Sequence, residues 1–512
     1  MRKRLLLIIL VIVLSACQAK PDLSNNIGAE PTESNHTETQ SNDTVGETAY
    51  QTKEQKGEEV VEPVNFRKQA LNGASIEIDP NWPYYQNRSV QSIADEIQLA
   101  GYKTVYYCLV NENFVNGDLI NAFHDRGIAV WLLVFGNGSY STQNFPDGWQ
   151  KWQMELVEPS DVAGFVFLSQ FSKEYVDWKK KSLARLVKEY PFDGVAILES
   201  FFPEWDGLVT KVYGDIGPNA QEAFREKYGT EIPDFKDPSA PNYYANNRTL
   251  YEQWIEFRVN GVNDFLDEIF NGEGGVREAN PDILVGTWSL GIDAGPSSVE
   301  KLREYQGLDA AAMVQQVKPD IHFFQTHWPD WIKPESELPA DYMKAYKPFY
   351  DQVREAAPEL PIGLQADNGS VESMIKSTKW QQQLNIEAQR HGYAAWTTYE
   401  YHIGGYIYNE KPVPMRAQRQ EDGTVIISFN KRIDDSSGEK LENYSVFQNG
   451  ELLDAGITKA QVDGNRVILT AEAFPIDSFE ISVRGVKDTP KLWLYKNYPA
   501  NEVPEGSKIQ VK

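Results

Sequence analysis

Cysteine is almost absent from this chain: Cys17 and Cys108 are the two cysteines among 512 residues. A framework of several disulfides is therefore excluded, and a chain of this length must be stabilised by at least one large hydrophobic core. Cys108 lies within the apolar run TVYYCLV, which predicts an inert thiol buried in that core.

Histidine is scarce, and two common catalytic motifs are missing. The six histidines show no H-x-x-x-H or similar spacing, so a metal site has little support. No G-x-G-x-x-G follows the first predicted strand, which argues against a dinucleotide-binding fold. No G-x-S-x-G elbow is present for a serine nucleophile. We therefore expect neither a metal nor an organic cofactor.

Positive charge is in deficit, whereas aromatic residues are plentiful. The chain holds 49 Lys and Arg against 74 Asp and Glu, which gives a formal net charge of −25. Nucleic acid is therefore not expected as a partner, because phosphate binding needs clustered Lys and Arg. Phe, Trp and Tyr make up 12% of the sequence, a rich supply of flat side chains.

A hydrophobic run long enough to span a bilayer is missing from the N-terminus. The segment MRKRLLLIILVIVLSAC begins with basic residues and continues with an apolar stretch of about ten residues, which suits a secretory signal. Its last four residues, LSAC, resemble the lipobox of bacterial lipoproteins. That resemblance implies cleavage before Cys17 and a lipid on its sulfur. Residues 1–17 are thus predicted to be a lipoprotein signal peptide and lipobox.

The lipobox resemblance implies a mature protein held by Cys17 on the extracellular face of the bacterial cell membrane. An ordinary signal peptide with a coincidental cysteine is the alternative. After lipidation only Cys108 remains, so no intrachain disulfide is expected. Residues 18–65 are rich in Ser, Thr, Asn, Gln and Glu and have almost nothing to bury, which predicts a disordered linker.

A repeating alternation of amphipathic helix and apolar strand begins near Ala74. Leu183, Leu186, Val187 and Tyr190, for example, follow the helical spacing i, i+3, i+4, i+7 and precede the apolar segment FDGVAILES. Helices that alternate with strands apolar on both faces predict a parallel sheet with helical cover.

Eight apolar segments of this kind follow one another along the chain. They are ASIEIDP, TVYYCLV, AVWLLVFGN, FDGVAILES, PDILVGTWSL, DIHFFQTHW, LPIGLQADNG and GYAAWTTYEYH. Eight alternations favour a closed (β/α)8 TIM barrel over residues 66–411 rather than an open doubly wound sheet. The long connection 217–280 is expected to carry an extra subdomain.

The pattern changes after about Pro412. Short alternating strands, among them GTVIISF, NRVILTA and SFEISVRGV, are separated by the turn pairs NG and DG. This predicts a small all-β sandwich over residues 412–512. The sequence ENYSVFQNG…DGNRVILT…FEISVRGVKD resembles bacterial Ig-like domains, which implies a spacing or packing module. Its separate pattern predicts independent folding, so deleting it would leave the barrel largely intact.

Polar side chains recur where the predicted strands end, which is where the active sites of barrel enzymes form. Glu199 ends the fourth strand and is followed by Phe201, Phe202 and Trp205. The other strands contribute, at the same point, Asp79, Glu112, His327, Asp367 and Glu400. Tryptophans in or just past these ends are Trp82, Trp131, Trp205, Trp288, Trp328 and Trp396.

Carboxylates and tryptophans together at strand ends are typical of carbohydrate-active sites. Flat aromatic faces stack on sugar rings, and carboxylates act on the glycosidic bond that joins two rings. Glycoside hydrolysis needs two carboxyl groups: one protonates the leaving oxygen, and the other attacks or activates water. We therefore expect an O-glycosyl hydrolase in which Glu199 is the general acid. Phe201, Phe202 and Trp205 would raise its pKa by excluding water. The tryptophans, Asp79, Glu112 and His327 are expected to bind the substrate.

The fourth strand also resembles a known family. EYPFDGVAILESFF resembles the fourth strand of the family-10-like glycoside hydrolases. LYEQWIEFRVNGVNDFLDEI and VREANPDILVG resemble the following helix and the fifth strand of those and related clan A barrel glycosidases. The resemblance covers roughly residues 66–410 and implies that Glu199 is the acid/base. In clan A the nucleophile lies on the seventh strand, where LPIGLQADNG has Ala366 in place of Glu and Asp367 one residue later.

Several alternatives stay open for these residues. Glu199 is either the acid or a strand-end carboxylate in an ion pair, and Asp367 is either the second catalytic carboxylate or the start of an Asx turn before Asn368-Gly369. Glu400 is the reserve second carboxylate, or it binds substrate or orients a partner. Some of the tryptophans are expected in the core. The alternative function is a surface lipoprotein that binds glycan without cleaving it.

Overall fold

The computed structural model describes residues 65–112, 114–160, 164–401 and 404–511. The signal peptide, the lipidation site Cys17 and the linker up to residue 64 lie outside the described residues, so these three predictions stay predictions. Within the described ranges, no helix combines the length and the apolar content needed to cross a membrane.

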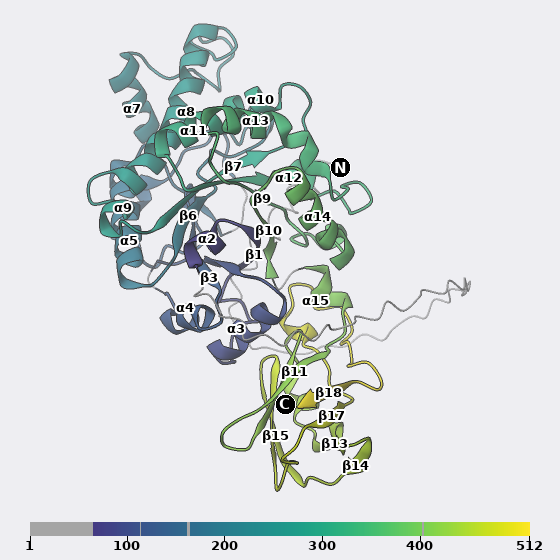
Figure 1. Cartoon of the computed structure of the whole chain (residues 1–512). Coiled ribbons are helices and arrows are strands. Elements are labelled where there is room, and N and C mark those ends of the chain that lie inside the picture. The colour runs from purple at the N-terminus through teal and green to yellow at the C-terminus, as the bar shows by residue number, and fades with distance from the viewer. Residues whose placement is uncertain (1–64, 113, 161–163, 402–403, 512) are drawn as a thin grey trace, which may run out of the picture.

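Eight parallel strands close into a barrel at the centre of the larger part of the molecule (Figure 1). Around the barrel they pair in the order β1-β10-β9-β8-β7-β6-β3-β2. Their bounds are β1 Gly73–Ile78, β2 Thr104–Cys108, β3 Ala129–Phe135, β6 Gly194–Leu198, β7 Leu284–Gly291, β8 Ile321–Thr326, β9 Ile362–Gln365 and β10 Ala395–Glu400. Each predicted apolar segment supplies one strand, so the predicted (β/α)8 barrel is confirmed.

Helices cover the outside of the barrel because each has one apolar face. In α5, for example, Ser172 caps the N-terminus by accepting a hydrogen bond from the backbone N–H of Tyr175, and Leu183, Leu186 and Val187 are buried. The covering helices are α3 Val90–Leu99, α4 Gly117–His124, α5 Lys173–Glu189, α8 Arg248–Asn271, α10 Ser298–Gln306, α11 Ala310–Val317, α13 Lys347–Ala356 and α14 Thr378–Arg390.

The N-terminal end of the barrel is closed by α2 (Phe66–Ala70). The side-chain amide of Gln69 donates to the carbonyls of Lys103 and Gly127, which precede β2 and β3. The indole N–H of Trp131 donates to the carbonyl of Ala70 at 3.1 Å. This end of the barrel is therefore sealed by protein.

Aromatic rings fill the barrel interior above α2. Tyr106 stacks on Trp131 with ring centroids 5.6 Å apart, and Trp288 stacks on Phe323 at 4.7 Å. Gly194 lies opposite Trp131 because a β-carbon there would come within 2.4 Å of the indole. Trp131 and Trp288 are thus packed core residues, and the prediction that they bind substrate is wrong for both.

Shorter elements lie in the loops between strands and helices. The connection from β6 to β7 has its own apolar cluster, which includes Tyr213, Phe224, Trp254 and Phe257. This agrees with the expected extra subdomain. The short helices and strands are β4 Gly138–Ser139, β5 Val166–Phe167, α6 Gly207–Thr210, α7 Pro218–Tyr228, α9 Val276–Ala279, α12 Trp328–Trp331 and α15 Gly405–Asn409.

The C-terminal part is all-β apart from short helical turns. Its strands pair in the order β14-β13-β17-β18-β11-β12-β16-β15. One parallel pair, Ala417 with Val511, joins two four-stranded antiparallel halves, and both halves contribute to one core. The predicted all-β fold is confirmed, and its Ig-like character stays a prediction. The bounds are β11 Pro414–Arg419, β12 Val425–Phe429, β13 Tyr444–Gln448, β14 Glu451–Leu453, β15 Ile457–Asp463, β16 Arg466–Ala471, β17 Phe479–Val483 and β18 Lys508–Val511.

The two parts share an extensive interface. Arg432 donates through its guanidinium to the carbonyls of Tyr84 and Gln86, and Arg416 pairs with Asp95 of α3. Trp493 and Tyr495 of the C-terminal part are buried in the apolar core of the barrel. These contacts argue against the expectation that the C-terminal part can be deleted without damage to the barrel, because its removal would uncover buried aromatic and charged groups.

Candidate active site

A cavity of about 180 Å³ opens at the C-terminal end of the barrel strands. Residues from strand ends and from the loops that follow them form its wall, as expected where the βα loops converge. The predicted site residues that it brings together are Asp79, Glu199, Trp205, His327, Trp328 and Asp367. Further aromatic side chains in the wall are Phe135, Tyr140, Phe165, Phe167, Phe201, Trp331 and Tyr399.

Glu199 follows the last residue of β6 in a strained backbone conformation. Its φ of 50° lies in the left-handed region, which costs a residue with a side chain roughly 1–2 kcal/mol. Strain of this kind concentrates at functional sites, where the surrounding structure enforces it. Burial raises the pKa of Glu199 to about 7, and a hydrogen bond with the side chain of Gln325 opposes that rise. The carboxyl is therefore partly protonated at neutral pH.

The aromatic residues after Glu199 divide between the cavity and the core. Phe201 and Trp205 line the cavity with Glu199. Phe202 is fully buried and lies under the guanidinium of Arg258, whose carbon is 4.5 Å from the ring centroid. Phe202 is therefore part of the packing beneath the loop, and the expectation that it lies in the site with the other two is wrong.

Asp367 lies two residues beyond the end of β9 and begins a tight turn. Its Oδ1 accepts hydrogen bonds from the backbone N–H groups of Gly369 at 3.0 Å and Ser370 at 2.9 Å. Burial raises the pKa of Asp367, while these hydrogen bonds and the charge of Lys376 oppose the rise. The Asx turn is thus present, and the same residue also lines the cavity. The two readings of Asp367 are compatible.

His327 offers a hydrogen-bond donor in the cavity wall. Its Nδ1 accepts the backbone N–H of Trp328 at 2.9 Å, so the proton of the neutral ring is on Nε2. Burial lowers the pKa of His327 to about 3, which keeps the ring neutral. Nε2 is buried and has no hydrogen-bond partner among the described residues. The edge of this ring meets Trp205 at 5.6 Å between centroids.

Three residues of the site were missed by the sequence-based prediction. Glu77 is buried inside the barrel, and burial together with the charges of Asp367 and Glu199 raises its pKa to about 8. Gln325 and Gln365 line the cavity beside the predicted residues. Strand alternation was the available signal, because Glu77, Gln325 and Gln365 each precede a predicted site residue by two positions and so point to the same side.

Other predicted residues lie outside this cavity. Glu112 makes a buried ion pair with Lys179 at 2.7 Å, so a substrate role for it is not supported. Trp82 is buried in the main core, and Trp396 lines a different cavity on the outer side of β10. Glu400 ends β10, and its side chain is outside the described part of the structure. Among the described residues, no group of three or more His, Cys, Asp or Glu is placed to hold a metal ion.

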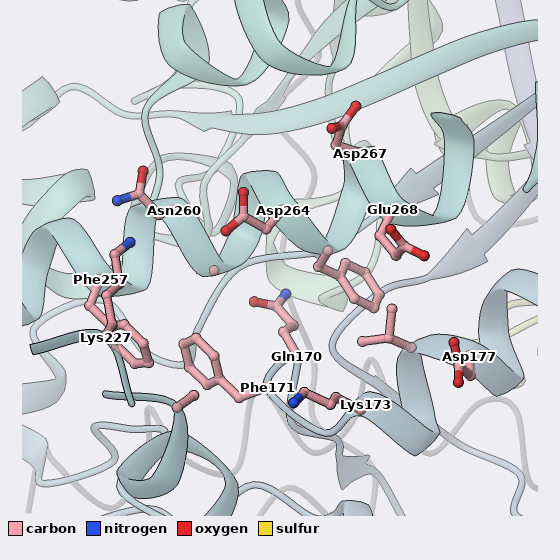
Figure 2. A pocket seen from close by; sticks show the side chains of 14 residues that line it. Gln170, Phe171, Lys173, Asp177, Lys227, Phe257, Asn260, Asp264, Asp267 and Glu268 are labelled. Carbon is pink, nitrogen blue, oxygen red and sulfur yellow. The ribbon is translucent and has the colours of Figure 1, made fainter. Parts of the chain in front are cut away.

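A larger depression of about 610 Å³ lies on the outer surface between α5, α7 and α8. Figure 2 shows Asp264, Asp267 and Glu268 of α8 on one side and Lys173 and Asp177 of α5 on the other. It is away from the strand ends, and its floor includes the stacked rings of Phe171 and Phe257. We therefore take the smaller cavity, at the strand ends, as the candidate active site.

Comparison with known proteins gives distant matches to solved structures alone. No protein-family profile and no curated protein sequence matches the chain. The glycoside hydrolase domain of PgaB (BpsB) from Bordetella bronchiseptica is 14% identical with a TM-score of 0.46, over 65% of this chain and 94% of that one.

Two further solved structures show a similarly low sequence identity to this chain. A β-galactosidase from Bacillus circulans sp. alkalophilus is 13% identical with a TM-score of 0.45, over 64% of this chain and 50% of that one. An endo-1,4-β-D-mannanase from Thermotoga petrophila RKU-1 is 10% identical with a TM-score of 0.37, over 69% of this chain and 91% of that one. The chain thus matches about half the length of the β-galactosidase. Likenesses this distant transfer neither activity nor substrate to this chain.

Proposed function

We propose that the barrel hydrolyses O-glycosidic bonds of a polysaccharide or cell-surface glycan. The observation that carries this proposal is a pair of carboxyl groups in one aromatic cavity whose surroundings differ. Burial raises the pKa of Glu199 to about 7, whereas two backbone N–H groups hold Oδ1 of Asp367. A buried carboxyl that keeps its proton near neutral pH, beside a second carboxyl in different surroundings, is a pattern from which an acid and its partner are assigned.

Glu199 acts as the general acid in this proposal. Its protonated form donates to the glycosidic oxygen, so that the leaving sugar departs as a neutral alcohol. Phe201 and Trp205 exclude water from one side of the carboxyl and thereby keep the proton on it near neutral pH. The strained backbone at Glu199 fixes the direction of the side chain.

Asp367 is the proposed second carboxylate, and Glu400 is kept as the reserve. The hydrogen bonds to Oδ1 fix the carboxylate of Asp367, and Oδ2 is the oxygen that would attack the anomeric carbon or activate water. Glu77 stays protonated at neutral pH because its pKa is about 8. A neutral Glu77 beneath the cavity avoids a second negative charge beside the proposed carboxylate of Asp367.

The cavity wall supplies the contacts that hold a sugar. Trp205 and Trp328 offer flat apolar surfaces, and the Nε2–H of His327 offers a donor to a hydroxyl group. A buried donor without a partner is costly, and a ligand hydroxyl would remove that cost. Asp79 lines the same wall and can accept a hydroxyl hydrogen bond.

The second candidate function is glycan binding without cleavage. The departure of the seventh strand from the clan A pattern favours it, because Ala366 stands where that pattern has the nucleophile. Asp367 also has a structural role as the start of the Asx turn. In this case Glu199 would accept or donate hydrogen bonds to a bound sugar and transfer no proton.

Glu199→Gln separates the two candidates, because glutamine keeps the shape but has no proton to donate. We expect glycan binding to survive and turnover on a panel of aryl glycosides and polysaccharides to fall by about 10²–10⁴-fold. Aryl glycosides with acidic leaving groups should be less affected, since they need no protonation. In the wild type, kcat/KM should fall as the pH rises through about 7, where Glu199 loses its proton; the variant should lack that limb.

Glu226→Gln on α7 is the matched control, because Glu226 is exposed and does not line the cavity. Turnover of the Glu199 variant at the wild-type rate would refute the assignment of the acid. A wild type that binds glycan and cleaves no member of the panel would instead establish the binding function.

A further inference from the structure

Among the described residues, β10 is not followed by a full eighth covering helix. The short helix α15, residues Gly405–Asn409, is followed by β11 of the C-terminal part. In Figure 1, α15 lies at the junction of the barrel and the C-terminal part. A cavity of about 350 Å³ occupies this place, between α3 and α14 on the outer side of β1 and β10. We call it the interdomain slot.

Aromatic and amide side chains line the interdomain slot. Tyr102, Trp396, Tyr401 and Tyr406 form an aromatic wall, in which Tyr401 contacts Tyr102 and Tyr406 with ring centroids 6.3 and 5.0 Å apart. The amide side chains Gln381, Gln382 and Asn385 of α14 lie across from them in the lining. The volume falls within the range of small-molecule sites, about 300–1,000 Å³.

The buried polar atoms of this lining that have no partner among the described residues include Nε2 of Gln381, Nε1 of Trp396 and the hydroxyl of Tyr406. Gln381 is only 8% exposed, so its amide is held within the protein rather than at the open surface. Each such group costs about 1–3 kcal/mol when left unpaired. Three such donors in the lining of one slot indicate a place that can receive hydrogen-bond acceptors.

The charged residues of the slot are already paired within the protein. The ammonium of Lys431 donates to the carbonyls of Ile407 and Glu410 and to Asp488 at 2.7–2.9 Å. The carboxylate of Glu410 accepts a hydrogen bond from the hydroxyl of Thr378. Asp488 therefore balances the charge of Lys431, so the described lining offers no free cation to an anionic ligand, and an uncharged ligand fits the slot best.

We propose that the interdomain slot is a second binding site, for a neutral oligosaccharide of pyranose rings. Such rings combine an apolar C–H face, which packs on aromatic side chains, with hydroxyl groups that accept from Gln381, Trp396 and Tyr406. The slot lies on the outer side of the barrel strands, whereas the proposed catalytic cavity opens at their C-terminal ends. The proposal goes beyond hydrolysis and does not require it.

The test uses the full chain carrying Glu199→Gln and Trp205→Ala, which prevent turnover and weaken binding in the catalytic cavity. Isothermal titration calorimetry is done with cellohexaose, chitohexaose and mannohexaose. We expect at least one hexaose to bind this background. Adding Gln381→Met, which removes one donor and nearly keeps the bulk, should weaken that binding about tenfold, as loss of one hydrogen bond predicts. Trp396→Phe removes a donor together with part of the aromatic surface and should weaken it by at least as much.

Gln389→Met, an exposed change on the same helix, and Trp178→Phe on α5 are the matched controls and should leave the affinity unchanged. Binding that is absent for all three hexaoses, or indifferent to both slot variants, would overturn the second site. Hydrolysis by the wild type without slot binding would leave the proposed function standing. Slot binding without any hydrolysis would support the second site and count against the proposed hydrolysis.

Discussion

The side chains of β1 show how strand alternation selects the groups inside the barrel. Glu77 and Asp79 are two positions apart, so both point inward, while Ile76 and Ile78 pack against the helices. Glu77 lies beneath the cavity and Asp79 lines it. The same spacing separates Gln325 from His327 and Gln365 from Asp367 on the neighbouring strands.

Glu77→Gln should change how stability depends on pH. The pKa of Glu77 is 4.5 as an ordinary carboxyl and about 8 in the folded chain. Its contribution to stability is therefore complete below pH 4.5 and is lost as the pH rises towards 8. Glutamine does not titrate. The free energy of unfolding of the variant, relative to that of the wild type, should therefore rise by a few kcal/mol as the pH increases from 4.5 to about 8. Urea unfolding at several pH values measures the difference.

Glu300→Gln is the control for this experiment, because Glu300 is exposed on α10. It should leave the pH dependence of the wild type in place. Parallel unfolding curves for the wild type and the Glu77 variant at every pH would show that Glu77 is ionised in the folded state.

At the level of elements, close approach between β3 and β6 depends on a glycine. Trp131 of β3 pairs in register with Gly194, the first residue of β6. A β-carbon at Gly194 would come within 2.4 Å of the Trp131 ring, and the ring is fixed by its hydrogen bond to Ala70. The glycine therefore lets the sheet close over a large side chain.

Gly194→Ala should destabilise the barrel by about 1–3 kcal/mol, because the added methyl group overpacks a rigid core. The midpoint of urea unfolding should fall accordingly. Gly117→Ala is the control, since a β-carbon at the start of α4 would lie 3.4 Å from Tyr190, an ordinary contact. A midpoint for Gly194→Ala equal to that of the control would show that the Trp131 ring can move aside.

On the scale of the whole molecule, the C-terminal part supports the proposed active site. The hydroxyl of Tyr495 donates to the carbonyl of Gly369 at 2.9 Å, in the turn that begins at Asp367. Asn497 donates to Glu372 in the same loop. The segment that follows β17 thus reaches from the C-terminal part back to the end of β9.

Truncation after Pro412 should therefore damage the barrel. Removing the C-terminal part uncovers Tyr84 and the Arg88–Glu96 pair, whose side chains are 0% and 2% exposed. We expect a lower unfolding temperature and aggregation, measured by calorimetry and light scattering. Tyr495→Phe, which removes a single hydrogen bond, is the mild comparison and should stay soluble. A truncated barrel as stable as the full chain would contradict the importance of the interface.

Anchoring is the other prediction at this scale, and it concerns residues outside the described structure. Cys17→Ser should release the protein from the membrane fraction or block processing of the signal peptide, because the lipid is expected on the Cys17 sulfur. A chain starting at Phe66 should be soluble and folded. Mass spectrometry of the purified wild type detects the lipid. Wild-type protein that carries no lipid and is free in the medium would refute the anchor.

The sequence by itself determined the (β/α)8 barrel, the order of its strands along the chain and the place of Glu199 at a strand end. These features depend on local patterns, the helical and strand periods, which a chain carries without reference to distant residues. The all-β character of residues 412–512 followed from the same kind of pattern.

Tertiary structure decided which of the predicted residues meet. The sequence analysis placed Trp131, Trp288 and Trp205 in or just past strand ends, but the first two lie in packed layers of the barrel, and of the three only Trp205 lines the cavity. Depth within a closed barrel depends on the stagger between strands, which no single strand's pattern records. The pairing of Glu112 with Lys179 and the contacts of Tyr495 also join residues far apart in the chain, so only the folded molecule could reveal them.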